Sequence, residues 1–312
     1  MIDITIENFE AELIQASVAQ PVLLDIWAPW CGPCKSLGPI LEKLEVAYGG
    51  RFKLAKLNSD EQPEISGQLS QAFGVRSIPF CVMFVGGAPV DGFVGALPES
   101  QVREFLDKHV PSEDALEAQE GVAEAEALLD AGGSPEEALA RLYAALETDP
   151  ANLAARLDAA RIELMDGQAD AARALLAPVA AEAIVNVRVA AFQQWLTAVE
   201  AGLQDEAKLR AAIAANRRDF DARLALARQL MAQGNWPTAM DELLEIIMRD
   251  KAWGDEAPRK LYVAMLELMT KPAAPVAEAA KTGALELTGK AAVTPADPLL
   301  DQYRRKLSMA LF

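Results

Sequence analysis

Two cysteines separated by two residues, in the segment Trp30–Cys34 (WCGPC), constrain the fold of this chain more than any other feature. They follow an apolar run, Val22–Trp27, that predicts a buried strand. Residues three apart on the first turn of a helix bring their side chains to one side, and the unpaired N–H groups of that turn favour a thiolate. The spacing therefore predicts a strand followed by a helix whose N-terminus carries a redox dithiol. One cysteine would attack a disulfide, and the other would release the product.

Length, charge and cysteine count limit the possible functions. The chain has 312 residues, 52% of them hydrophobic, which is enough for two or more domains. Its net charge is −17, which argues against a basic surface for nucleic acid or anionic lipid. We find no signal peptide and no apolar run near the roughly 20 residues of a membrane span. We expect a cytoplasmic protein that binds neither nucleic acid nor membrane, in which three cysteines build no disulfide framework.

Residues 1–110 alternate strands and helices. Strands are predicted at 3–6, 21–27, 52–57, 80–85 and 90–94, and helices at 9–16, after Cys31, at 61–73 and at 98–109. Two glycines at 86–87 would join the last two strands in a hairpin. The pattern predicts an α/β fold, with a mixed central sheet flanked by helices.

Several residues around the motif match a known family. In the family's order they are Asp25 to Lys35, Pro39, Lys56, Ser77 to Pro79, and Gly95. Residues 1–110 therefore resemble thioredoxin. The resemblance implies that Cys31 is the attacking thiolate, that Cys34 resolves the mixed disulfide, and that Pro79 is a cis-proline facing the motif. It also implies a buried pair, Asp25 and Lys56, beneath the cysteines.

These positions would support thiol–disulfide exchange. Cys31 attacks a substrate disulfide, and Cys34, after losing a proton, cleaves the mixed disulfide that results. Asp25 is the candidate proton acceptor, because a carboxylate in an apolar strand has a raised pKa. A cis-proline leaves the preceding backbone free to pair with an extended substrate. The predicted substrate-docking residues are Trp30, Gly32, Pro33, Ile78 and Gly95.

Other interpretations of these residues stay open. Cys31 and Cys34 could supply two ligands to zinc, but Cys81 and His109 offer no second pair at ligand spacing, so we predict no metal. The motif could be an inactive relic, and the buried pair beneath it a structural ion pair. Cys81, in an apolar strand, is either a small core residue or a redox thiol.

After a short polar linker at 111–115, the sequence becomes alanine-rich and repetitive. Gly133, Gly167, Gly202 and Gly234 lie 34, 35 and 32 residues apart. A period near 34 residues with paired helices is the tetratricopeptide pattern. We predict an all-α, tetratricopeptide-like domain over 116–312, in which these glycines end the first helix of each pair. The repeat at 187–219 departs from the pattern, with Phe192 and Trp195 where small residues are expected.

The end of the chain differs from the repeats. Prolines at 272, 275 and 295 predict a looser connection over 271–295, and a final helix follows at about 297–312. In it Leu299, Tyr303, Leu307 and Leu311 recur every four residues. Such a stripe either packs on the last repeat or docks to a partner.

A thioredoxin domain followed by a tetratricopeptide domain resembles the chaperedoxin family of bacterial co-chaperones. The resemblance implies a holdase that binds unfolding or oxidised clients, protects or reduces their cysteines, and passes them to a GroEL-type chaperonin. The family's terminal helix would dock to the chaperonin, here through Tyr303, Arg304, Arg305, Leu307, Leu311 and Phe312. Thioredoxin reductase or another thiol donor would recycle the dithiol. No adenine-nucleotide motif is evident, so we predict no cofactor and no ATP-driven refolding.

Two other functions fit the same sequence. The chain could be a thioredoxin-type protein-disulfide reductase whose repeats target one folded partner. It could also be a scaffold in which the thioredoxin fold supplies only surface.

Overall fold

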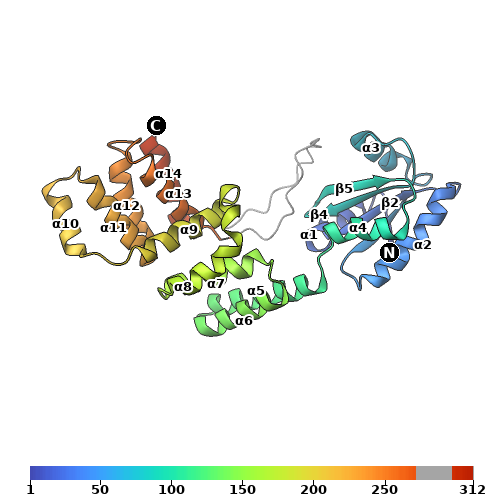
Figure 1. Cartoon of the computed structure of the whole chain (residues 1–312). Coiled ribbons are helices and arrows are strands. Elements are labelled where there is room, and N and C mark those ends of the chain that lie inside the picture. Colours follow the sequence, from blue (N-terminus) through green and yellow to red (C-terminus); the bar gives the residue numbers. More distant parts are fainter. Residues whose placement is uncertain (272–296, 312) are drawn as a thin grey trace. The chain divides into compact units, whose positions relative to one another are not determined.

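The chain divides into two compact units. The computed structural model describes residues 1–271 and 297–311, and the units separate between Leu116 and Glu117 (Figure 1). Residues 113–115, which the sequence assigns to a linker, already belong to helix α5 (Glu113–Asp130). None of the helices in the described ranges is long and apolar enough to cross a membrane.

A five-stranded mixed sheet forms the centre of the first unit. Its strands lie in the order β1-β3-β2-β4-β5, with β1 (Ile2–Asp3), β2 (Val22–Trp27), β3 (Lys53–Asn58), β4 (Phe80–Val85) and β5 (Ala88–Val94). β3 pairs in parallel with β1 and β2, whereas β4 is antiparallel to both of its neighbours. Strands β2 and β4 are buried on both faces, which is why they are nearly continuous apolar runs.

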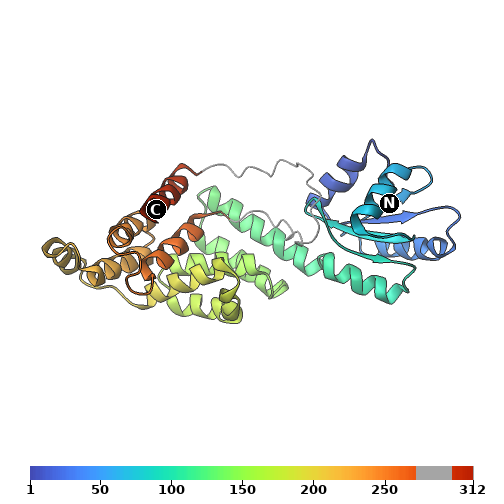
Figure 2. The ribbon, with the colours of Figure 1, turned by 90° about the horizontal axis from the view of Figure 1, so that it is seen from above.

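Helices cover both faces of this sheet. Helices α2 (Gly32–Ala47) and α4 (Glu99–His109) pack on one face. A π-helical turn (Glu10–Gln15) leading into α1 (Ala16–Ala19), together with α3 (Pro63–Phe73), lies on the other. Figure 2 shows the sheet between these two groups. The predicted α/β fold is confirmed. Several bounds differ: β1 is shorter than the strand predicted at 3–6, and the first helical segment extends to Ala19. Strand β5 begins at Ala88 rather than at 90, and α3 begins at Pro63 rather than at 61.

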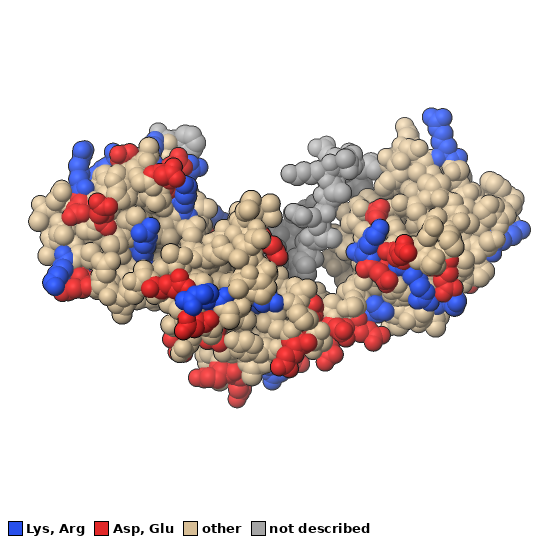
Figure 3. Space-filling model, viewed as in Figure 1, with Lys and Arg blue, Asp and Glu red and all other residues tan. Residues whose placement is uncertain are grey.

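The second unit is helical, as predicted. Besides α5 and a 3-10 segment (Ala177–Ile184) it contains α6 (Pro135–Thr148), α7 (Leu153–Met165), α8 (Ala169–Leu176), α9 (Val187–Glu200), α10 (Glu206–Ala215), α11 (Phe220–Ala232), α12 (Trp236–Ile247), α13 (Ala257–Met269) and α14 (Pro298–Leu311). Acidic side chains gather over α5 and α6 in Figure 3. Helix α7 packs on α6 and α8, and α11 packs on α10 and α12, with small residues such as Ala160 and Ala227 fully buried.

Glycines follow α5, α7, α9 and α11, with one correction to the predicted positions. Gly167, Gly202 and Gly234 follow α7, α9 and α11 with φ values of 76°, 71° and 72°. In the first pair Gly132, with φ of 75°, takes the left-handed position instead of Gly133. A side chain at Gly133 would collide with Leu128, so this second glycine is required for close packing.

Helix α13 departs from regular stacking. It follows α12 in the chain but packs mainly on α9. Arg161 of α7 donates a hydrogen bond to the carbonyl oxygen of Leu268 at 3.2 Å. Arg188 of α9 donates to the carbonyl oxygens of Glu267 and Thr270 at 3.2 and 3.0 Å. Two arginines thus bind carbonyl groups at the C-terminus of α13, where the Glu267 carbonyl also accepts a hydrogen bond from the Thr270 N–H at 3.1 Å.

The apolar stripe of α14 packs on the end of the repeat unit. Tyr303 and Leu307 of the predicted stripe are buried against α12 and α13, but Leu300 is buried there in place of Leu299, which is 42% exposed. The hydroxyl of Tyr262 donates to the carbonyl oxygen of Tyr303 at 2.8 Å, and the Tyr303 hydroxyl donates to Asp241 at 3.1 Å. Apart from Lys271, the predicted connection at 271–295 lies outside the described residues.

Candidate active site

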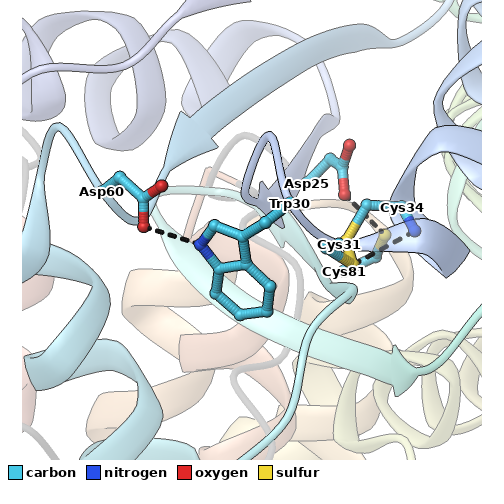
Figure 4. Close-up of a disulfide and its surroundings, with 6 residues drawn as sticks. All are labelled: Asp25, Trp30, Cys31, Cys34, Asp60 and Cys81. Carbon is cyan, nitrogen blue, oxygen red and sulfur yellow. Dashed lines mark hydrogen bonds between the residues drawn. A yellow bond between two sulfur atoms is a disulfide. The ribbon is translucent and has the colours of Figure 1, made fainter.

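The two motif cysteines form a disulfide at the N-terminus of α2 (Figure 4). Cys31 is the N-cap residue, and its sulfur accepts a hydrogen bond from the backbone N–H of Cys34 at 3.2 Å. Both residues are nearly buried, with exposed fractions of 4% and 5%, so exposure does not distinguish them. Their positions at the helix terminus distinguish the two cysteines, because the N–H groups and the dipole of α2 would stabilise negative charge on the Cys31 sulfur after reduction.

The predicted docking residues lie around this disulfide. Trp30 is 70% exposed, and its indole N–H donates to Asp60 at 3.1 Å. Ile78 packs against the cysteine pair, and the peptide bond from Ile78 to Pro79 is cis. The Gly95 N–H donates to the Pro79 carbonyl oxygen at 2.8 Å, which places Gly95 at the same edge. The structure therefore brings together Trp30, Gly32, Pro33, Ile78, Pro79 and Gly95, of which Gly32 and Pro33 are also exposed.

Asp25 lies in β2, with only 2% of its surface exposed. Burial raises its pKa to about 6, while attraction to Lys56 and a hydrogen bond from Cys81 act in the opposite direction. Lys56 and Cys81 are the register partners of Asp25 in the two neighbouring strands. At neutral pH the carboxyl group is therefore mostly ionised but close enough to its pKa to exchange a proton.

Lys56 forms a different ion pair from the one predicted. Its ammonium group lies 2.9 Å from Glu42 of α2, and it also lies 5.1 Å from the centre of the Trp27 ring. Glu42 is partly exposed, so its charge needs less desolvation than that of Asp25. Lys56 thus acts on Asp25 by electrostatic attraction rather than as its contact partner.

Cys81 is the contact partner of Asp25 that sequence reasoning missed. Its thiol donates a hydrogen bond to Asp25 Oδ1, with sulfur and oxygen 3.7 Å apart (Figure 4). The residue is fully buried, and burial together with Asp25 raises the pKa of the thiol well above its ordinary value. The available signal was register: pairing of the predicted strands at 21–27 and 80–85 places Cys81 opposite Asp25.

In residues 1–271 and 297–311, no three His, Cys, Asp or Glu side chains form a metal-binding group.

The residues predicted to dock to a chaperonin lie on α14, and only some of them are exposed. Tyr303 and Leu307 are buried and Leu311 is half-buried, whereas Arg304 and Arg305 are exposed. Phe312 lies outside the described residues. The buried stripe can contact a partner only if α14 leaves α12 and α13.

Comparisons with known proteins agree with this geometry. The thioredoxin family profile matches residues 1–108. Thioredoxin 1 of Nostoc sp. is 40% identical over 107 residues, which are 34% of this chain and 94% of that protein. The chain belongs to the thioredoxin family. The thioredoxin of Chlorobaculum thiosulfatiphilum is 45% identical over 106 residues, which are 34% of this chain and 93% of that protein. The thioredoxin of Haemophilus influenzae is 40% identical over 103 residues, which are 33% of this chain and 91% of that protein.

The rest of this thioredoxin-family chain matches a second class of profile. Tetratricopeptide repeat profiles match residues 131–196 and 199–283. The relatives named above match 103 to 107 residues of this chain, which is about the length of the thioredoxin domain. The architecture is therefore a thioredoxin domain followed by tetratricopeptide repeats, which couples a dithiol to a fold that commonly presents protein-binding surfaces.

Proposed function

We propose that this chain is a chaperedoxin, an ATP-independent holdase that acts on the cysteines of the unfolding proteins it binds. The observation that carries the proposal is the Cys31–Cys34 disulfide at the N-terminus of α2, next to Ile78 and Pro79, in a chain that also carries tetratricopeptide repeats. The dithiol would supply the chemistry, and the repeat domain would retain the client.

The redox step is a two-electron exchange. The Cys31 thiolate attacks one sulfur of a client disulfide, which forms a mixed disulfide and releases the other client sulfur as a thiolate. Cys34 then gives its proton to Asp25 and attacks the Cys31 sulfur. The Cys31–Cys34 disulfide forms, and the second client sulfur leaves as a thiolate that takes up a proton. The client is reduced and the chain is oxidised, so thioredoxin reductase or another thiol donor must restore the dithiol.

Client segments would dock at the exposed edge of the site. Trp30 presents a largely exposed apolar ring beside the cysteines. Within the described residues, the backbone N–H and C=O groups of Ile78 make no hydrogen bond, so they are free to pair with an extended chain. An unfolded segment offers both apolar side chains and unpaired backbone groups, which suits this edge better than a folded surface does.

A variant with Cys31 and Cys34 both changed to Ser separates reduction from holding. The full-length wild-type chain should reduce insulin disulfides and should suppress aggregation of a thermally unfolding protein. The double variant should lose reduction and keep suppression, with Ser36→Ala on the exposed side of α2 as the matched control. If wild type fails to suppress aggregation, the holdase proposal is wrong; if it fails to reduce insulin, the redox proposal is wrong.

Hand-over to a chaperonin is the part of the proposal that α14 would carry. Deleting the helix would uncover Tyr262 and its neighbours, so exposed charges give a cleaner test. Changing Arg304 and Arg305 to Glu should reduce co-purification with a GroEL-type chaperonin at least tenfold. The matched control is the adjacent exposed pair Arg259 and Lys260 on α13, also changed to Glu. Equal binding by both variants would refute docking through the exposed basic face of α14.

The second candidate is a thioredoxin-type reductase whose repeats target one folded partner. The packing of α14 favours it, because Tyr303 and Leu307 are buried and not available for docking. If this candidate is right, the wild-type chain should reduce insulin but should not suppress aggregation. The first proposal expects the reverse of the double cysteine variant, which should suppress aggregation without reducing insulin.

A further inference from the structure

Cys81 and Asp25 form a buried polar contact inside the thioredoxin domain. They lie opposite each other in the antiparallel pairing of β4 with β2. Their exposed fractions are 0% and 2%, and the Cys81 sulfur is 3.7 Å from Asp25 Oδ1. A polar contact shielded from water in this way has more effect on an ionised carboxylate than the same contact at the surface.

Other groups face Asp25 from each neighbouring element. Lys56 lies opposite Asp25 in β3, and its ammonium group forms an ion pair with Glu42 of α2. Cys31 and Cys34 lie at the N-terminus of α2. None of these donates a hydrogen bond to Asp25. Among residues 1–271 and 297–311, the Cys81 thiol is the one hydrogen-bond donor to this carboxylate. A buried carboxylate with a single donor depends strongly on that donor.

We propose that Cys81 is a positioning residue for thiol exchange: its S–H group donates to Asp25 Oδ1, fixes that carboxylate, and stabilises the ionised form that accepts the proton of Cys34. The inference rests on the proposed redox function, because the state of Asp25 matters to catalysis only if the dithiol exchanges disulfides. The sequence left two roles open for Cys81, a small core residue or a redox thiol. The proposed role is a third one, because the thiol donates a hydrogen bond and takes no part in electron transfer.

The environment of Cys81 fits a donor rather than a nucleophile. Full burial and the neighbouring carboxylate both raise the pKa of its thiol. The thiol therefore keeps its proton when Cys31 is ionised, and a buried protonated thiol is unreactive. Two titratable groups in contact thus take complementary states: Asp25 ionises, and Cys81 stays neutral and donates.

The oxidised protein allows a direct spectroscopic test. The chain has three cysteines, so once Cys31 and Cys34 are joined, Cys81 holds the sole S–H group. We expect its infrared S–H stretching band to move to lower frequency as the pH rises through the pKa of Asp25, because an ionised carboxylate is the stronger acceptor. In Asp25→Asn the band should not titrate. A band that stays fixed in wild type would overturn the proposal.

Substitutions of Cys81 test the consequence for Asp25. Cys81→Val suits a strand but cannot donate, whereas Cys81→Thr has nearly the same shape and restores a donor. The measurement is the Asp25 pKa in the reduced full-length chain, from the pH dependence of its carboxyl ¹³C NMR signal. Loss of the donor should raise that pKa by about 0.5 to 1 unit, and Thr should reverse at least half of the rise. Met83→Leu, on the same face of β4, controls for a change of side-chain shape in the same core and should leave the Asp25 pKa unchanged.

The catalytic readout follows from the same shift. If resolution of the mixed disulfide requires ionised Asp25, Cys81→Val should slow it about threefold at pH 6 and little at pH 8. An unchanged Asp25 pKa in Cys81→Val, or an equal rise in the Val and Thr variants, would contradict the hydrogen-bond account. The pKa shift is measured without any client. If Cys81→Val shifts the Asp25 pKa but wild type does not reduce disulfides, the proposed redox function is wrong, whereas the hydrogen bond from Cys81 to Asp25 is supported.

Discussion

Each unit of the molecule holds a mostly buried aspartate, and the two differ in what surrounds them. Asp25 in β2 borders the N-terminus of α2 and receives a hydrogen bond from Cys81. Asp158 in α7 has its pKa raised by burial as well, but its charged neighbours are Arg161, Glu126 and Arg188. Burial therefore raises both pKa values, and of the two aspartates only Asp25 lies beside cysteines. A shifted pKa therefore indicates a reactive site only together with a reactive neighbour.

The two units also use helix N-termini differently. Cys31 caps α2 with a sulfur that is part of a disulfide. Asn186 caps α9 with a side-chain oxygen that accepts hydrogen bonds from the N–H groups of Arg188 and Val189. The same local geometry serves chemistry in the first unit and stability in the second.

Removing the largest core side chain of the repeat domain should produce the largest change in stability. Trp195 is fully buried, and its ring lies 5.2 Å from that of Trp236 in an edge-on arrangement. Trp195→Ala should lower the free energy of unfolding of this unit by about 3 to 5 kcal/mol, because a large cavity replaces the indole. Denaturant unfolding of the full-length chain measures the loss. Insulin reduction should change less than twofold, and a parallel loss of reduction would break the distinction between the two units.

Replacing Asp25 should stabilise the thioredoxin domain at high pH. Its pKa is about 6 in the folded protein and 3.8 ordinarily, so between these values the folded state binds the proton more tightly. The unfolding free energy therefore falls as the pH rises through about 6. Asp25→Asn avoids this loss and should gain about 2 to 3 kcal/mol at pH 8 and almost nothing at pH 3.5. Asp158→Asn should show a gain in the same direction, and only Asp25→Asn should also slow resolution of the mixed disulfide. Equal slowing by both variants would contradict the comparison.

Removing the α9 cap should give the smallest effect. Asn186→Ala leaves two N–H groups without their acceptor and should destabilise the repeat domain by about 1 kcal/mol. Thermal unfolding of the full-length chain provides the measurement. Asn186→Asp, which keeps an acceptor at the helix N-terminus, should remain within a few tenths of a kcal/mol of wild type. A loss as large in the Asp variant as in the Ala variant would show that the cap is not the cause.

Local sequence patterns predicted the elements that depend on local rules. The thioredoxin-type motif, the mixed sheet and the glycine-ended helices follow from spacing and periodicity, which short segments contain. The partners of Asp25 were harder to predict. Lys56 reaches Glu42 through a long side chain, and Cys81 reaches Asp25 only because of strand register. Neither contact leaves a signal in neighbouring residues.

Long-range packing limited the prediction in the repeat domain as well. Phe192 and Trp195 interrupt the small-residue pattern because α9 contacts α7, α11 and α13 and has more space to fill than a helix with two neighbours. The return of α13 to α9, held by Arg161 and Arg188, joins residues about 80 to 107 positions apart. Periodicity within one repeat does not encode such a contact.

The most direct test asks whether the dithiol acts on the same proteins that the chain holds. Cys34→Ser should trap the mixed disulfide through Cys31, since the resolving thiol is absent. The full-length variant is incubated with a disulfide-containing protein, either folded or unfolding, and the mixed disulfide is quantified on non-reducing gels, with Cys31→Ser/Cys34→Ser as the blank. We expect trapping to be at least tenfold greater with the unfolding protein, and we expect that protein to stay in solution. Equal trapping of the folded and unfolding forms would contradict the proposal.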